Sequence, residues 1–234
     1  MFSFRPLLIG YDTFERHRLV ASLMKDIQGK TLDVGGSPGL LTKFTTSPVF
    51  VTNLEKGDVV SSGLNLPFAN ETFDFVTSLD VLEHIPLEKR LRFVSELVRV
   101  AKFNVITCAP FGSKEHIDQE KEIMAILATE GISNQMLAEH VQNGIPELES
   151  FLSYLPSDLE VDAWFSGDFR INSLLFTIDH WKGTRYFKLV KIVIAVMFNL
   201  IGNLFIYPFF ISKQPRRFTN RMTFLITKKR CGQA

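Results

Sequence analysis

Short apolar runs alternate with longer segments of helical periodicity along most of the chain. Strands are predicted at 31–34, 49–54, 73–79, 104–109, 159–165 and 222–228, and helices at 11–28, 87–101, 115–131, 134–142 and 146–154. The first helix illustrates the pattern, because Phe14, Leu19 and Leu23 recur at three- to five-residue spacing. Strands that alternate with helices indicate an α/β fold with a mostly parallel sheet.

One long connection, before the last predicted strand, departs from this alternation. Residues 192–211 contain no charged side chain, and a segment of this length could span a membrane. A single membrane-spanning helix would place the last strand on the opposite side of the bilayer from the sheet that it should complete. We therefore expect the segment to lie in the membrane interface, to form a re-entrant hairpin, or to pack on the domain. Asn199, Gly202, Asn203 and Pro208 favour a broken or hairpin shape over one straight helix.

Charge is distributed unevenly, although the formal net charge is only +1. From Lys182 onward there are eleven Lys or Arg and no Asp or Glu, whereas the preceding residues hold 15 basic and 25 acidic side chains. Basic residues flank the uncharged segment at Arg185, Lys188, Lys191, Lys213, Arg216 and Arg217. This pattern predicts attraction of residues 185–217 to an anionic membrane surface. A lid helix with a solvated basic rim is the alternative, and nucleic acid is unlikely because it leaves the uncharged residues unexplained.

A small-residue turn, 33–39, follows the first predicted strand with the sequence Asp-Val-Gly-Gly-Ser-Pro-Gly. An acidic residue at a strand end before such a turn is typical of a nucleotide-like cofactor site. The dinucleotide fingerprint requires glycine at its first, third and sixth positions. Counted from Gly35, the third position is Ser37 and the sixth is Leu40, so the fingerprint is not met.

Counted from Asp33, the same turn resembles motif I of the class I S-adenosylmethionine-dependent methyltransferases, with Ser37 where that family usually has glycine. Glu55 follows 22 residues later, at the spacing of an acid that binds ribose hydroxyls. The block 65–86, from Asn-Leu-Pro-Phe to Leu-Glu-His-Ile-Pro, closely resembles the type 11 branch of the family.

The resemblance implies one domain over 1–234 with a Rossmann-like, seven-stranded, mostly parallel sheet, helices on both faces and an antiparallel last strand. It also implies a helical substrate cap at 110–156. The family commonly joins its last two strands by a short connection, so residues 166–217 are an apolar, basic insertion in this chain. S-adenosylmethionine is the expected cofactor. The residues expected to bind it are Asp33, Gly35, Gly36, Ser37, Gly39, Glu55, Leu66, Asp80 and Val81.

Histidines are the candidates for acid–base chemistry, because a hydroxyl acceptor must lose its proton. His84 follows the strand that faces the reacting end of the cofactor in the family, and His116 and His140 lie in the expected cap. Structural roles are the alternative for each. We expect no metal; the weaker alternative is a cluster of Asp80, Glu83 and His84 on one helical face, similar to one in ubiquinone-type O-methyltransferases.

The segments 110–116 and 138–146 resemble a subgroup of these enzymes associated with bacterial and archaeal surface-glycan gene sets. We therefore expect O-methyl transfer to a lipid-linked glycan or another amphiphilic acceptor at a membrane. A lipophilic small molecule such as a quinone precursor is an alternative acceptor, and a non-catalytic binding or anchoring module is an alternative class. Cys108 and Cys231 form no metal-ligand spacing, which suits a cytoplasmic location, with peripheral association on the cytoplasmic face of a membrane.

Overall fold

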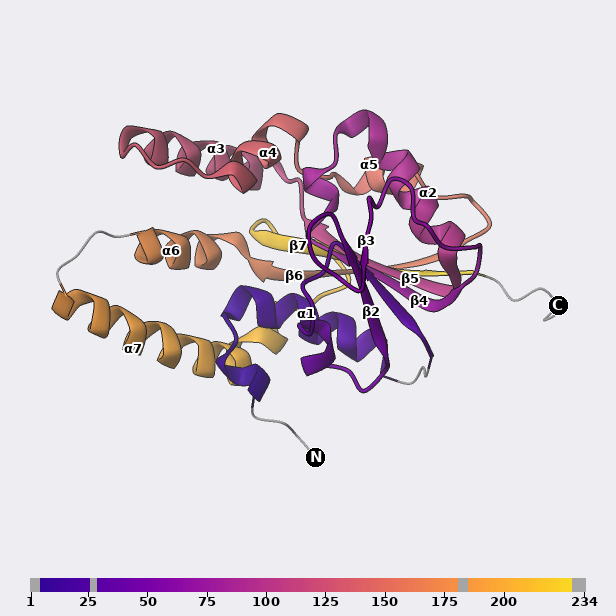
Figure 1. The fold of residues 1–234 in the computed structure, drawn as a ribbon. Helices are drawn as coiled ribbons and strands as arrows, with labels where there is room; N and C mark the ends of the chain where they lie inside the picture. Colours follow the sequence, from indigo (N-terminus) through magenta and orange to yellow (C-terminus); the bar gives the residue numbers. More distant parts are fainter. Residues whose placement is uncertain (1–4, 26–28, 181–184, 229–234) are drawn as a thin grey trace.

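The structure is a computed structural model that describes residues 5–25, 29–180 and 185–228 (Figure 1). Its centre is a seven-stranded sheet in the order β3-β2-β1-β4-β5-β7-β6. The strands are β1 (Thr31–Val34), β2 (Val49–Asn53), β3 (Val59–Val60), β4 (Phe73–Leu79), β5 (Ala101–Pro110), β6 (Glu160–Asp168) and β7 (Thr219–Thr227). Only β7 runs antiparallel to its neighbours, β5 and β6. This arrangement confirms the predicted Rossmann-like fold with an antiparallel last strand.

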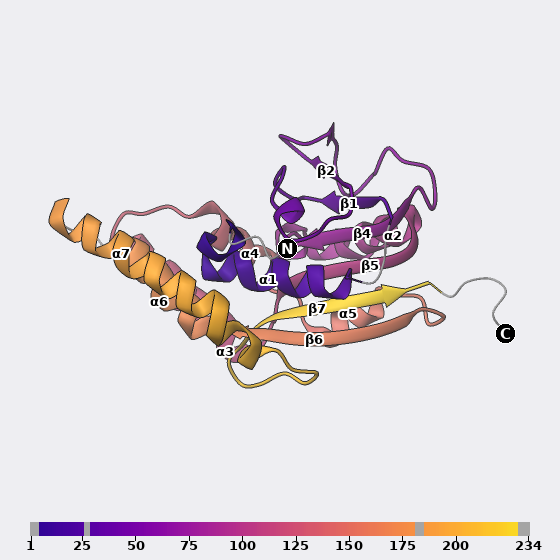
Figure 2. The ribbon, with the colours of Figure 1, turned by 90° about the horizontal axis from the view of Figure 1, so that it is seen from below.

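Helices cover both faces of the sheet (Figures 1 and 2). The α-helices are α1 (Tyr11–Leu23), α2 (Arg90–Val100), α3 (Lys114–Thr129), α4 (Gln135–Asn143), α5 (Leu148–Ser153), α6 (Phe169–His180) and α7 (Arg185–Ile201). On one face, Phe93 of α2 and Phe151 of α5 are buried in the main core. On the other, Val20 of α1 packs in a second cluster with Ile106 and Cys108 of β5.

Short helical turns complete the chain: the 3₁₀ turns η1 (Arg5–Leu8), η2 (Leu41–Lys43), η3 (Leu82–His84) and η4 (Leu87–Lys89), the π-helical turn η5 (Gly202–Ile206) and the 3₁₀ turn η6 (Tyr207–Phe210). The predicted strands at 31–34 and 73–79 have the observed bounds. The helix predicted at 11–28 ends at Leu23, and the one predicted at 87–101 is divided between η4 and α2. The two-residue strand β3 was missed because so short an element has no periodicity to detect.

Helices α3, α4, α6 and α7 all project from one end of the sheet, where the parallel strands finish (Figure 1). Within the expected cap, only α3 and α4 project in this way, because α5 packs on the sheet through Phe151. The connection between β6 and β7 contains α6 and α7, as the long insertion predicts. The insertion therefore lies at the end of the sheet where the parallel strands finish.

Of the broken or hairpin shapes expected for 192–211, the hairpin is not found, because the chain is helical as far as Phe210; the helix changes from α to π at Gly202 and to 3₁₀ at Tyr207. The polar residues in this run attach the helix to the N-terminal segment. Asn199 Oδ1 accepts a hydrogen bond of 2.9 Å from the Tyr11 backbone N–H. Asn203 Nδ2 donates to the carbonyls of Leu7 and Ile9, at 3.0 and 2.8 Å.

Candidate active site

The small-residue turn lies where β1 and β2 end. Gly35 and Gly39 have φ values of 81° and 75°, which side chains with a Cβ rarely adopt. The side-chain amide of Asn53, the last residue of β2, donates to the carbonyls of Gly35 and Gly36, both at 3.1 Å. Ser37 and Gly39 are exposed. The turn is thus held from the protein side and open on the side where a cofactor would bind.

Asp33 supports this turn from within the sheet. It is only 1% exposed, and its Oδ1 accepts a hydrogen bond of 2.9 Å from the Thr77 hydroxyl. A Cβ added to Gly36 would lie 1.9 Å from Asp33 Oδ2, so no larger residue fits there. Burial raises the pKa of Asp33 to about 6, although the Thr77 hydrogen bond opposes the shift. Asp33 therefore positions the glycine backbone on which a cofactor would rest.

Two further predicted cofactor residues border the turn. A Cβ on Gly35 would lie 2.4 Å from Val81 Cγ2, so Val81 packs directly against the glycine. Glu55 is exposed just beyond the end of β2. An exposed carboxylate two residues past this strand end fits the recognition of ribose hydroxyls.

Leu66, an expected cofactor residue of the 65–86 block, lies in the core. It is 4% exposed and belongs to the main apolar cluster. Its backbone N–H donates to Glu96 Oε2 at 2.8 Å, and its carbonyl accepts from Arg99 Nη2 at 3.0 Å. Both of its backbone groups are therefore engaged by the protein itself.

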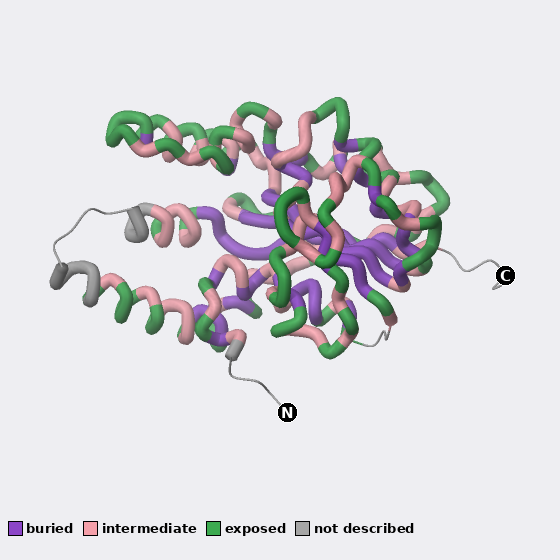
Figure 3. The backbone as a smooth tube through the Cα atoms, in the orientation of Figure 1, coloured by how far each residue is buried: buried purple, intermediate pink, exposed green. Residues whose placement is uncertain are grey.

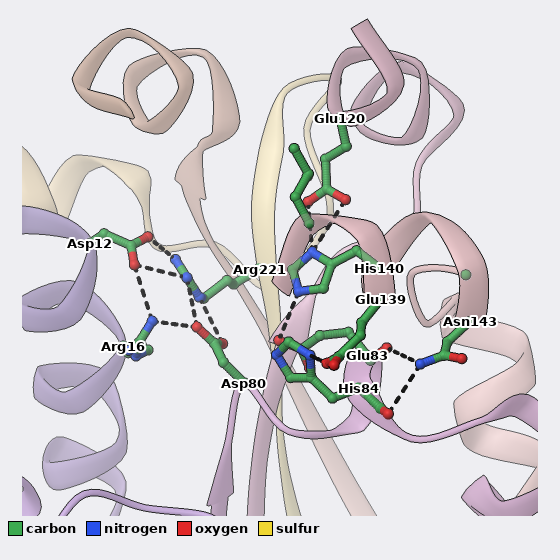
Figure 4. Close-up of polar contacts among 12 residues, drawn as sticks. Asp12, Arg16, Asp80, Glu83, His84, Glu120, Glu139, His140, Asn143 and Arg221 are labelled. Atoms are coloured by element: carbon green, nitrogen blue, oxygen red, sulfur yellow. Dashed lines mark hydrogen bonds and ion pairs between the residues drawn. The ribbon is translucent and has the colours of Figure 1, made fainter. Parts of the chain in front are cut away.

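Asp80 belongs to a buried ion-pair network and not to a cluster with Glu83 and His84. Arg16 and Arg221 both contact its carboxylate, the latter with bonds of 3.0 and 2.8 Å, and both arginines also pair with Asp12 (Figure 4). Burial opposes ionisation, but the two guanidiniums lower the pKa of Asp80 well below its usual range. The predicted helical face failed because Asp80 has a φ of 52°, outside the right-handed helical region.

Two of the three candidate histidines come together. The rings of His84 on η3 and His140 on α4 have centroids 4.9 Å apart (Figure 4). His84 Nδ1 hydrogen-bonds Glu139 Oε2 at 2.7 Å, and His140 Nδ1 hydrogen-bonds Glu120 Oε1 at 3.0 Å. The buried Glu83 completes the group, with Oε1 3.9 Å from His140 Nε2.

Burial and neighbouring charges shift the protonation of this group. Burial, reinforced by the negative charge of Asp80, raises the pKa of Glu83 to about 8. Burial alone would lower the pKa of His140, but its hydrogen bond and charge interaction with Glu120 raise it. At neutral pH, Glu83 and His140 therefore hold a proton more readily than their free side chains do.

His116 lies at the edge of the group. Its Nδ1 donates to the Phe111 carbonyl at 3.0 Å, its ring stacks on Phe169 with centroids 4.7 Å apart, and its Nε2 is 3.7 Å from Glu120 Oε1. Burial lowers its pKa. These contacts give His116 a structural role in holding Glu120 against α4.

The juxtaposition of η3 and α4 depends on a buried arginine. Arg90, at the start of α2, donates to the carbonyls of Ile85 and Asn143, both at 3.0 Å, and to that of Gly144. Asn143 Nδ2 in turn donates to the His84 carbonyl at 3.1 Å. Sequence analysis missed five residues whose partners are distant in the chain: Arg16, Asn53, Arg90, Asn143 and Arg221. The one available signal was the position of Asn53, Arg90 and Asn143 at the ends of their elements.

A cavity of about 410 Å³ lies elsewhere, bordered by Arg99, Tyr154 and Lys228 among others. Lys228 directly follows β7, whose antiparallel course ends beside the beginning of β5. This cavity is therefore at the opposite end of the sheet from the glycine turn and does not belong to the site.

The fold, the glycine turn and the acidic residue after β2 agree with the arrangement expected of a class I S-adenosylmethionine-dependent methyltransferase. Residues 32–108 match a family model described as a methyltransferase domain, of type 11. The match includes the turn, Glu55, Asp80 and the Glu83–His84 pair. Over these residues the chain is thus similar to a methyltransferase domain, which indicates S-adenosylmethionine as the cofactor. No curated protein matches it.

Two solved structures have a similar fold over most of the chain. A SAM-dependent methyltransferase from Thermotoga maritima has a TM-score of 0.53 at 13% identity, with 97% of this chain and 93% of that one covered. The magnesium protoporphyrin IX methyltransferase from Synechocystis PCC 6803, solved with bound SAH, has a TM-score of 0.53 at 11% identity, with 93% and 84% covered. A protein from Pyrococcus horikoshii is 22% identical, with a TM-score of 0.38, and the match spans 45% of this chain and 60% of that one.

Proposed function

We propose that this enzyme transfers the methyl group of S-adenosylmethionine to a hydroxyl oxygen of a membrane-associated amphiphilic acceptor, such as a lipid-linked glycan. The observation that carries the proposal is an exposed apolar helix on the side of the molecule that holds the active site. The segment Val190–Phe210 is long and apolar enough to cross a membrane, and only 17% of its most apolar window is buried. One such helix is weak evidence for a span, and here it precedes a strand of the sheet, so we assign it to the membrane surface.

Ten apolar side chains of this segment are exposed, whereas Phe198, Leu200 and Ile206 pack against the cluster around Tyr11. The exposed set is Val190, Ile192, Val193, Ile194, Val196, Met197, Ile201, Leu204, Phe205 and Phe209. Exposed apolar surface on this scale is typical of a site that binds another molecule or a lipid surface. Figure 3 shows the exposure along α7, and Figure 2 shows the helix extending away from the sheet.

Basic residues next to this segment support an anionic lipid partner. Arg217 is 72% exposed at its side chain, and Lys213 is 56% exposed. Each also has an acidic neighbour, Glu115 at 3.4 Å and Asp162 at 3.0 Å. Surface pairs of this kind are weak, so both cations can still contribute to attraction at a membrane surface. The side chains of Arg185 and Lys188 lie outside the described residues.

Cofactor binding follows from the turn. Gly35, Gly36, Ser37 and Gly39 would carry the aminoacyl end of S-adenosylmethionine, and Glu55 would accept hydrogen bonds from its ribose. The sulfonium supplies an activated methyl group, so the protein mainly has to align the acceptor with it. Asp33 and Asp80 act indirectly, by supporting the turn and by joining β4 to α1 and β7.

Acceptor activation is assigned to the group around His84 and His140. Its η3 residues directly follow Val81, which packs on the turn, so the group borders the proposed cofactor site. A hydroxyl placed there would lose its proton to a ring nitrogen of His84 or His140. His116 is a less suitable base, because its Nδ1 is engaged by Phe111 and its ring is stacked.

A quinone-like acceptor remains the second candidate acceptor. In that alternative the apolar segment would line a pocket, whereas its side chains are largely exposed. The test uses S-adenosylmethionine with a labelled methyl group and membranes from the source cell. We expect label in the lipid-extractable glycan fraction; label only in small quinone-like products would favour the alternative. Calorimetry that detects no cofactor binding by the folded protein would contradict methyl transfer altogether and favour a non-catalytic module.

A further inference from the structure

Three side chains with metal-ligand chemistry converge beside the cofactor turn. One ligand atom from each of Glu83, His84 and His140 lies within 4.8 Å of the others (Figure 4). Glu83 and His84 belong to η3, whereas His140 comes from α4. Two imidazoles and one carboxylate are a donor set that binds zinc and other divalent transition metals in proteins.

Both histidines are oriented by carboxylates outside this group. His84 Nδ1 is held by Glu139 at 2.7 Å, and His140 Nδ1 is held by Glu120 at 3.0 and 3.2 Å. A carboxylate accepts, so each Nδ1 carries the proton and each Nε2 keeps its lone pair when the ring is neutral. Metal-binding histidines are commonly held in this way, with the second nitrogen bound to a carboxylate.

The surroundings of the Glu83 carboxylate are a second, independent observation that points to a bound cation. The residue is only 1% exposed, yet its Oε2 has no hydrogen-bond partner among the described residues, and neither has the buried Nε2 of His140. A buried carboxylate oxygen without a partner is costly, because it has lost its hydration. A cation between Glu83 and the two histidines would satisfy the carboxylate and both ring nitrogens together.

We propose that Glu83, His84 and His140 bind one divalent transition-metal ion. Bonds of about 2.0–2.2 Å require ligand atoms somewhat closer together than 4.8 Å, which rotation about side-chain torsions can supply. The side chains of His84 and His140 are 20% and 15% exposed, so an ion can reach the site from solvent. Asp80 is not a ligand, because Arg16 and Arg221 occupy its carboxylate.

The catalytic use of this site rests on the proposed function, whereas metal binding does not. With three protein ligands, the ion would keep at least one position for an acceptor hydroxyl and would lower the pKa of that hydroxyl, whose proton would pass to solvent water before the oxygen takes the methyl group. Activation by the ion would replace proton removal by a histidine. The acceptor class is therefore a hydroxyl compound whose oxygen can coordinate a metal, as sugar hydroxyls do.

Binding is tested on the untagged full chain, without cofactor or acceptor. All proteins carry Cys231→Ser, since that thiol could also bind Zn²⁺. After treatment with a chelator, Zn²⁺ is titrated in competition with a chromophoric chelator, and Co²⁺ is followed by its visible absorption. We expect one equivalent bound. His140→Ala and Glu83→Gln should each weaken Zn²⁺ binding by at least about 100-fold, and Glu120→Gln by about 10- to 100-fold with unchanged stoichiometry.

The matched control is His17→Gln, because His17 is bound to the Thr13 carbonyl and stacked on Phe44, apart from the group. This variant should bind Zn²⁺ as the parent does. Equal affinity of the parent, His140→Ala and Glu83→Gln would overturn the proposal. If those variants do not fold, the parent is tested by reaction with diethyl pyrocarbonate, which modifies histidine side chains. Zn²⁺ should protect His84 and His140 from modification, and protection of neither would overturn the proposal.

Activity is measured separately, so the two proposals can fail independently. Methyl transfer by a protein that binds no metal would leave the proposed function intact and refute the site. If the parent binds one equivalent of metal and both variants lose it, the site is supported. If that parent transfers no methyl group, the proposed function is contradicted.

Discussion

His84 Nδ1 lies 2.7 Å from Glu139 Oε2, a contact that joins η3, the turn after β4, to α4. The same two elements meet through His140, whose ring centroid is 4.9 Å from that of His84. The chemistry of the site therefore depends on how firmly α4 is attached to η3. That attachment depends on hydrogen bonds from Arg90 and Asn143.

Replacement of Arg90 tests this attachment. Arg90 is 2% exposed, and Arg90→Met would leave the carbonyls of Ile85, Asn143 and Gly144 without their donor. We expect the free energy of unfolding to fall by about 2–4 kcal/mol in urea titrations, and methyl transfer to fall with it. The control Arg92→Met removes an exposed arginine with one bond, to the Leu64 carbonyl, and should change stability by less than about 1 kcal/mol. Equal urea midpoints for the two variants would contradict this role.

The glycine turn and the strands beside it were predictable from sequence, because their determinants are local. The turn needs glycines at fixed positions, and the strands beside it are short apolar runs whose order follows from the family pattern. The histidine group was only partly predictable. Sequence identified His84, His116 and His140 individually, but Glu120 and Glu139 become their partners only when α3 and α4 dock on η3.

Two errors in the sequence analysis have definite physical causes. The helical spacing of Asp80, Glu83 and His84 assumed right-handed helical backbone, but Asp80 has a positive φ and turns toward Arg16 and Arg221. Asn199 and Asn203 were interpreted as helix breakers, because polar residues in an apolar run commonly mark a bend. Their hydrogen-bond partners are at the opposite end of the chain, where no local pattern indicates them.

Removal of the Glu55 carboxylate should weaken cofactor binding without affecting stability. Loss of a hydrogen bond to a charged group costs about 1.5–3 kcal/mol, which is roughly 10- to 150-fold in Kd. We expect Glu55→Gln to raise the Kd for S-adenosylmethionine by at least about tenfold in calorimetry, with an unchanged Tm because Glu55 is exposed. Its exposed neighbour provides the control, Lys56→Gln, which should bind like the parent. Similar Kd values for both variants would exclude the proposed ribose contact.

Glu15 should make stability depend on pH. It is fully buried in α1, and burial raises its pKa from 4.5 to about 7; Arg221 opposes the shift, and Asp12 and Asp80 add to it. Since the folded pKa is above the unfolded one, the folded protein binds this proton more tightly. The associated stability is fully present below pH 4.5 and is lost as pH rises through 7.

The measurement compares Glu15→Gln with the parent in urea titrations from pH 5 to pH 8. The difference isolates Glu15, because the buried Asp33 and His17 titrate in both proteins. We expect the free energy of unfolding of the variant to rise by up to about 3 kcal/mol relative to that of the parent between pH 5 and pH 8. Glu122→Gln, which removes an exposed carboxylate, should follow the parent. A constant difference between the Glu15 variant and the parent at every pH would show that Glu15 keeps an ordinary pKa.

The exposed face of α7 should control binding to anionic vesicles. Val193, Ile194 and Met197 are 59%, 53% and 51% exposed, so their replacement by Ser removes apolar contact with lipid at little cost to the fold. We expect the triple variant to lose at least about tenfold in vesicle partitioning by flotation. Leu91, Ile126 and Leu152, which are 54%, 52% and 41% exposed on other helices, provide a triple Ser control that should float like the parent. Equal flotation of the two triple variants would exclude α7 as the membrane contact, and binding unaffected by salt would exclude the contribution of its basic neighbours.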